Sequence, residues 1–175
     1  MQRWRVPLGF ACAALFLFFA RPSSWTLIIG AAVALPGLLL RAWASGHLKK
    51  NEALATSGPY AYTRNPLYLG SFLIGLGLTI AAAQVLLVLI FLIMILGIYL
   101  PVMRVESATL AELFGKKYVR YAKEVPLLFP RLSAYRTQRG IKFDWTLYLR
   151  YREYRAALGL VIVWALLVLK AIYFK

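Results

Sequence analysis

Cysteine, histidine and acidic residues are all scarce in this 175-residue sequence. There is one cysteine, Cys12, and one histidine, His47, and six acidic residues stand against 21 lysines and arginines. A lone cysteine excludes an internal disulfide framework, and the sequence has neither a CxxC nor an HExxH motif. One histidine cannot build a zinc site by itself. We therefore expect no structural or catalytic metal.

Apolar residues, by contrast, dominate the chain. They make up 62% of the sequence, the mean hydropathy is +0.69, and residues 68–103 contain no charge. A membrane-spanning helix needs about 20 apolar residues. The sequence therefore predicts an all-α integral membrane protein with one membrane domain over residues 1–175. Its spans, about five in number, are expected at residues 6–20, 25–40, 68–82, 85–103 and 156–174.

The basic residues indicate how this protein lies in its membrane. A cytosolic amino terminus leaves Arg21, Lys170 and Lys175 on the far side, so 18 of the 21 basic residues are cytosolic. Such an excess is typical of cytosolic loops. We expect a multi-pass protein of the cell inner membrane, or of the endoplasmic reticulum in a eukaryote. Because basic residues border the spans, we assign the net charge of +15 to orientation and anionic lipid headgroups, not to nucleic acid.

A polar, turn-rich loop precedes the third span. Arg64 ends this loop directly against the apolar run, where a charge needs a partner or an anionic ligand. Glu106 follows the fourth span, and a helical hairpin places Arg64 and Glu106 at the same end of adjacent helices. We expect Glu106 to be the partner of Arg64, and the loop, the hairpin and Glu106 to form one site. A purely structural ion pair is the alternative.

The residues around this expected site favour a ligand. Tyr60 and Tyr68 offer aromatic faces to a cation or a base, and the turn at residues 56–58 can present backbone amides to an anion. Asn65 precedes Pro66, which is a natural start for the third helix. Small residues in this span are expected to serve close helix packing, namely Gly75 and Gly77 and also Gly70, although a ligand role stays open at Gly70 because it lies one turn from the loop.

The chain becomes amphipathic after the fourth span. Apolar side chains recur there at steps of three or four residues, which indicates a helix with one apolar stripe. We expect this stripe to lie against the membrane or the loop, and a further interfacial helix to precede the last span. The cytosolic loop and these interfacial helices would together form an active site. The stripe comprises Leu110, Leu113, Phe114, Tyr118 and Tyr121.

Two motifs lie in order around the hairpin, within about residues 52–130. The first reads Thr56-x-Gly58-Pro59-Tyr60 and Arg64-x-Pro66-x-Tyr68-x-Gly70; the second reads Glu106, Leu110, Phe114-Gly115, Tyr118, Tyr121 and Val125-Pro126. Together they resemble the signature of the isoprenylcysteine carboxyl methyltransferases and related phospholipid methyltransferases. The resemblance implies an integral membrane enzyme that uses S-adenosylmethionine to methylate a lipophilic acceptor from the bilayer, releasing S-adenosylhomocysteine.

The resemblance also implies roles for particular residues, with Arg64 and Glu106 as the catalytic pair. The chain departs from the family pattern at Asn65, where a histidine is usual, at Glu52, where a histidine is frequent, and at Ser107, where a second acidic residue is usual. An asparagine can form hydrogen bonds but cannot take a proton. Binding of the methyl donor is assigned to His47, Glu52, Thr56, Ser57, Gly58, Tyr60, Arg64, Asn65, Tyr68 and Glu106.

Carboxyl O-methylation is the favoured reaction. A carboxylate acceptor is ionised at pH 7 and needs no base, whereas an amine or thiol acceptor does. His47 is the one neutral base candidate, although a lone histidine beside lysines is more often a solvated loop residue or a hydrogen-bond partner of the donor. Amine N-methylation of a phospholipid is the alternative within the enzyme class. A non-enzymatic membrane scaffold or carrier is the alternative outside it, and the sequence leaves the acceptor and the oligomeric state open.

Overall fold

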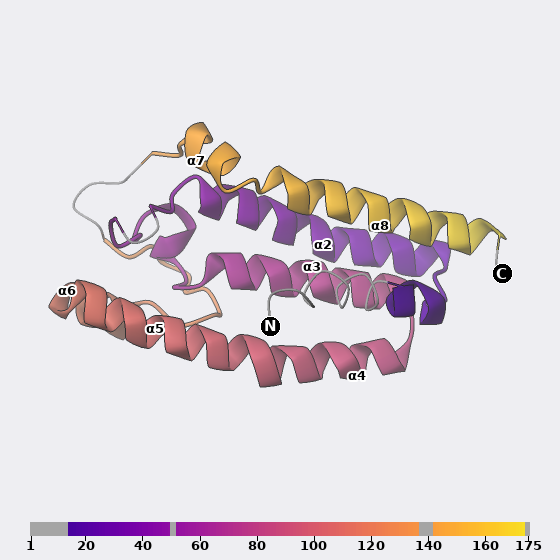
Figure 1. Ribbon diagram of the computed structural model, residues 1–175, viewed down its shortest axis with the longest axis horizontal. Helices are drawn as coiled ribbons and strands as arrows, with labels where there is room; N and C mark the ends of the chain where they lie inside the picture. The colour runs from indigo at the N-terminus through magenta and orange to yellow at the C-terminus, as the bar shows by residue number, and fades with distance from the viewer. Residues whose placement is uncertain (1–13, 50–51, 137–141, 174–175) are drawn as a thin grey trace, which may run out of the picture.

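The protein is a bundle of long helices with short helices and loops gathered at one end (Figure 1). The computed structural model describes residues 14–49, 52–136 and 142–173, and this part contains helices, turns and loops but no strand. A short helical segment covers residues 14–19. The elements that follow are α2 (Ser24–Ser45), η2 (Gly58–Ala61), α3 (Pro66–Ala82), α4 (Val85–Met94), η3 (Ile95–Tyr99), α5 (Leu100–Phe114), α6 (Lys116–Glu124), α7 (Trp145–Arg150) and α8 (Tyr154–Tyr173).

Three helices of the described part are long and apolar enough to cross a membrane. They are α2, α8 and the continuous 30-residue helix Val85–Phe114, which α4, η3 and α5 form together. Helix α3 is also apolar but has 17 residues. The predicted all-α membrane fold is confirmed. The count of five spans stays a prediction, because residues 6–13 of the first span lie outside the described residues.

Charge is distributed unevenly between the two ends of the bundle. One end, which we call the loop end, holds η2, α6, α7 and the starts of α3 and α8 (Figure 1). The six acidic residues belong to the loop after α2, to α5 and α6, or to the residues just before α7 and α8, whereas Arg21 and Lys170 belong to the opposite end, where α2 begins and α8 ends (Figure 1). The Lys170 ammonium donates there to the carbonyl oxygen of Phe18 at 2.8 Å. The loop end therefore has the charge pattern expected of a cytosolic side.

Helices α2 and α3 pack closely because glycines face each other at two levels. A Cβ atom added to Gly30 would lie 2.4 Å from the Gly77 carbonyl oxygen, and one added to Gly37 would lie 2.6 Å from that of Gly70. Small residues allow helix backbones to approach in this way. The prediction that Gly77 serves helix packing is confirmed, and Gly70, for which a ligand role was also left open, packs on α2 as well. The first motif is thus fixed to α2 by the packing of α3.

Helices α3 and α4 touch near the turn that joins them and then separate toward the loop end. Gly75 packs on Phe91, because an added Cβ would lie 2.5 Å from that ring, so the predicted packing role of Gly75 is confirmed too. Farther along, the rings of Tyr68 and Tyr99 meet edge to face with centroids 5.8 Å apart. Beyond this pair, a cavity lies between the start of α3 and α5.

An ion pair joins α2 to the residue that precedes α8. The Arg41 guanidinium donates to both carboxylate oxygens of Glu153, at 2.8 and 2.9 Å, and to the hydroxyl of Ser71 at 2.6 Å. The two charged side chains are only 22% and 12% exposed. Because the pair is bidentate and shielded, it ties three helices together at the loop end.

We expect Glu153→Ala to lower the free energy of unfolding by about 3 kcal/mol, because it leaves the Arg41 guanidinium shielded without its counter-charge. Thermal unfolding in detergent measures this loss. Glu124→Ala, which removes an exposed carboxylate from α6, is the control and should have little effect. Arg41→Met combined with Glu153→Ala should recover part of the loss. If the losses of stability in Arg41→Met and Glu153→Ala simply add up in the double variant, the two side chains do not act as a pair.

Candidate functional site

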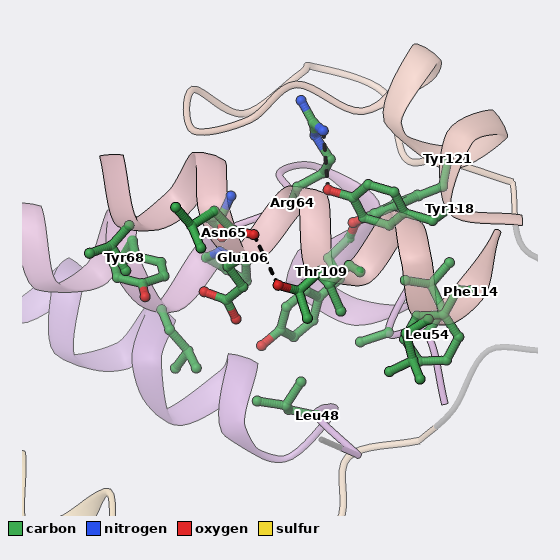
Figure 2. Close-up of a pocket in the computed structure, with 18 of the residues that line it drawn as sticks. Leu48, Leu54, Arg64, Asn65, Tyr68, Glu106, Thr109, Phe114, Tyr118 and Tyr121 are labelled. Carbon is green, nitrogen blue, oxygen red and sulfur yellow. Dashed lines mark hydrogen bonds between the residues drawn. The ribbon is translucent and has the colours of Figure 1, made fainter. Parts of the chain in front are cut away.

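A cavity of about 960 Å³ opens at the loop end between α3 and α5 (Figure 2). Its walls come from residues 48–49 and 53–55, from η2, from the first turns of α3 and from one face of η3 and α5. Ligand pockets usually occupy about 300–1,000 Å³ and are mainly apolar with a few polar groups. This lining fits that description, and its charged members are Arg41, Lys49, Arg64 and Glu106.

Backbone pairing with a distant segment holds the first motif in place. Pro66 begins α3 as predicted, with Asn65 as the preceding cap residue. The Arg64 amide donates to the carbonyl oxygen of Pro126 at 3.0 Å, and the Asn65 side-chain amide donates to that of Leu127 at 2.9 Å. The end of the second motif therefore supports the start of α3, which fixes both walls of the cavity relative to each other.

Glu106 is the acidic residue that lines the cavity among the described residues. It lies on α5, and no ion pair involves it in the described part of the chain. The next residue, Ser107, faces a different direction, because successive helical residues are turned by about 100°. Figure 2 shows the Glu106 carboxylate pointing away from the Arg64 guanidinium and toward the tyrosines of the cavity.

Arg64 lines the same cavity. Contrary to the expectation from the sequence, it does not contact Glu106. Its guanidinium donates to the hydroxyls of Ser107 at 3.2 Å and Tyr118 at 3.3 Å, and its Nε is buried without a hydrogen-bond partner. The direct Arg64–Glu106 pair is therefore a wrong prediction. The reason is the rotation of α5, which presents Ser107 to the arginine and Glu106 to the cavity.

The structure brings half of the predicted donor-binding residues to the cavity wall. These are Tyr60, Arg64, Asn65, Tyr68 and Glu106. The others, which do not line the cavity, are His47, Glu52, Thr56, Ser57 and Gly58.

His47 and Gly58 shape the loop instead. The His47 ring is 5% exposed, and its Nδ1 lies 2.9 Å from the Trp43 carbonyl oxygen. Gly58 has a φ of +59°, and a Cβ atom there would lie 2.6 Å from the His47 ring. Only glycine combines this backbone conformation with such a close approach. His47 therefore packs beneath the turn, away from the cavity.

Two tyrosines of α6 form part of the cavity although neither is among the predicted donor-binding residues. The Tyr121 hydroxyl donates to the Tyr60 carbonyl oxygen at 2.6 Å, and Tyr118 contacts Arg64. Burial raises the pKa of Tyr60 and of Tyr121 well above the usual value, so both stay neutral at physiological pH. The spacing of the apolar stripe was the signal for them, since all five stripe residues line the cavity.

No group of three or more histidine, cysteine, aspartate or glutamate side chains clusters within residues 14–49, 52–136 and 142–173.

Comparison with known proteins gives matches to a family and to several curated relatives. The phospholipid methyltransferase family matches residues 38–117. A cobalt-zinc-cadmium resistance protein of Cupriavidus metallidurans is 32% identical over 140 residues, which is 76% of this chain and 64% of that protein. A nickel-cobalt-cadmium resistance protein of Alcaligenes xylosoxydans xylosoxydans is 28% identical over 142 residues, which is 77% of this chain and 66% of that protein.

A protein-S-isoprenylcysteine O-methyltransferase of Schizosaccharomyces pombe is 33% identical over 81 residues, which is 46% of this chain and 34% of that protein. The chain thus spans slightly less than two thirds of the two resistance proteins and about one third of the methyltransferase. No solved structure matches the chain.

Proposed function

Residues 38–117 of this chain match the phospholipid methyltransferase family, and from this match we propose that the protein is an integral membrane methyltransferase. S-adenosylmethionine is the methyl donor and a lipophilic molecule of the bilayer is the acceptor. The observation that carries this proposal is Glu106, an acidic side chain without an ion pair in the described chain that faces a cavity of about 960 Å³. When bound, S-adenosylmethionine supplies an electrophilic methyl group.

The residues of the cavity fit such a donor. Glu106 supplies a negative charge for its cationic part, and Lys49 supplies a positive charge for its carboxylate. Tyr68 and Tyr99 present aromatic surface to its rings. Asn65 uses its side-chain NH₂ on Leu127, which leaves the amide oxygen as an acceptor. The cavity volume is at the upper end of the usual range, so it leaves room for part of an acceptor.

Methyl transfer from a sulfonium is an in-line displacement, so the protein's task is alignment and exclusion of water. Glu106 would fix the donor's charged end, and apolar residues such as Val102 and Leu113 would keep water from the reacting atoms. Arg64 is held by Ser107 and Tyr118, so we assign it the positioning of α5 against α6.

Carboxyl O-methylation remains the reaction that we favour. A carboxylate needs no base, and the one histidine packs beneath the loop and does not line the cavity. An amine acceptor would require Glu106 to hold the donor and also to take a proton. The basic loop end supports an active site on the cytosolic side.

The names of two relatives concern metal resistance. No observation on this chain favours metal binding over methyl transfer, because its described residues offer no cluster of metal ligands.

Transfer of a labelled methyl group tests the proposal. Purified protein in detergent, given methyl-labelled S-adenosylmethionine and a total lipid extract, should form labelled lipid that releases volatile methanol after base treatment. Label that resists base would exclude a methyl ester and is the result expected of N-methylation. Absence of transfer, together with no heat of S-adenosylhomocysteine binding to protein shown to be folded, would favour a scaffold or carrier.

A further inference from the structure

A second hollow lies beside α5, on a different face from the cavity. It has a volume of about 510 Å³, and its α5 wall consists of Arg104, Ser107, Ala108 and Ala111. These residues recur at steps of three or four and therefore share one face of the helix. Because Arg64 and Tyr118 line both the cavity and this hollow, they form the partition between them.

This hollow, which we call the basic groove, is lined by three cations and no acidic residue among the residues described there. The cations are Arg64, Arg104 and Lys123, from three different segments of the chain, and the hydroxyls of Ser107 and Tyr118 lie among them. Three positive charges that converge without a counter-charge repel one another. An anion in the groove would relieve this repulsion.

Arg64 supplies an independent sign of a ligand. Its guanidinium points away from the cavity (Figure 2), and its Nε is buried without a hydrogen-bond partner. A buried, unpaired N–H group costs roughly 1–3 kcal/mol, and more when the group is charged. Arginine presents its N–H groups in a planar fork that matches the oxygens of a phosphate.

The position of the groove along the bundle indicates where its ligand comes from. Arg64 is the last charged residue before the apolar run, and Arg104 is the first after it. Both therefore lie where the hydrocarbon ends and lipid headgroups begin. Phosphate oxygens are the anionic groups at that depth.

We propose that the basic groove binds one phosphate group, held by Arg104, Lys123 and the outer edge of Arg64, and supplied by a lipid headgroup. This site goes beyond the proposed methyl transfer, because its ligand lies on the other side of Arg64 from Glu106. The bound phosphate offsets the positive charge of Arg64 and fixes α5 and α6 at the membrane surface.

The test compares two double variants that remove the same charges. Arg104→Gln with Lys123→Gln empties the groove of two cations, whereas Arg120→Gln with Lys116→Gln removes two exposed cations of α6 that do not line it. Binding of phosphatidylglycerol to the purified full-length protein in detergent, measured by native mass spectrometry, should weaken about tenfold in the groove variant. The control should change less than about twofold.

Titrations with inorganic phosphate and with phosphatidylcholine separate the sources. If the groove variant loses binding of inorganic phosphate and the control variant keeps it, the groove holds a soluble phosphate and the proposed lipid source is wrong. Equal weakening in both double variants would overturn the proposal, since general charge attraction would then explain binding, and so would no weakening in either. Unfolding midpoints establish that both double variants fold. If the groove variant does not fold, the single variant Lys123→Gln is used in its place.

Discussion

Glu106→Gln should lower the rate of labelled methyl transfer by about 100-fold and weaken binding of the methyl donor to a similar degree. Glutamine keeps the shape of the side chain but removes the one negative charge that the described residues present to the cavity. A fixed charged or polar group that faces the reacting ligand contributes about 10²–10³ in rate. Initial rates with labelled S-adenosylmethionine and isothermal titration of the donor measure the two effects.

Glu112→Gln is the matched control for this prediction. Glu112 lies on the same helix, is exposed and does not line the cavity, so its replacement removes an equal charge from the same element. We expect its rate and binding to stay within about twofold of wild type. A Glu106→Gln protein that turns over at a rate near wild type would remove the central support for methyl transfer in this cavity.

The fold was predictable from sequence because the length of an apolar run is a local property. Residues 68–103 already required two helices in a membrane, and the structure has α3 and the long helix Val85–Phe114 there. What the sequence did not show is that the fourth span and the amphipathic helix after it are continuous. The long helix runs 11 residues past residue 103, the predicted limit of the span, and ends before Gly115.

The end of the bundle that carries the site was predictable, but the contacts within it were not. The hairpin puts Arg64 and Glu106 on one cavity, as connectivity requires. Which residue of α5 meets Arg64 depends on the rotation of that helix, and a spacing of about forty residues does not determine it. Arg64 consequently contacts Ser107, the residue that follows Glu106.

Contacts between distant segments were not predictable for a different reason. Arg41 and Glu153 are 112 positions apart, and neither lies in a motif that would indicate a partner. The same holds for Asn65 and Leu127, whose hydrogen bond joins the two motifs. Such contacts follow from how the helices pack, which in α2 and α3 depends on glycines.

The packing of α2 against α3 leads to the largest expected effect on folding. Gly77→Leu should yield no monodisperse protein in detergent, and Gly77→Ala should lose roughly 3 kcal/mol of stability. An added Cβ would lie 2.5 Å from the Gly30 carbonyl oxygen and 2.7 Å from the Ala34 side chain. The first neighbour is backbone and cannot rotate away, so the whole helix has to move. Size-exclusion chromatography and thermal unfolding measure the two variants.

Gly159 of α8 provides the matched control, because a Cβ atom added there meets nothing within 4 Å. Alanine favours a helix over glycine by about 1 kcal/mol at either position. Gly159→Ala should therefore be neutral or stabilising, and Gly159→Leu should remain monodisperse. The sign of the change at residue 77 is opposite, because steric overlap there exceeds the gain in helix propensity. If Gly77→Ala were as stable as Gly159→Ala, α2 and α3 would not be in contact at Gly30 and Gly77. The packing on α2 would then not explain how the first motif is held in place.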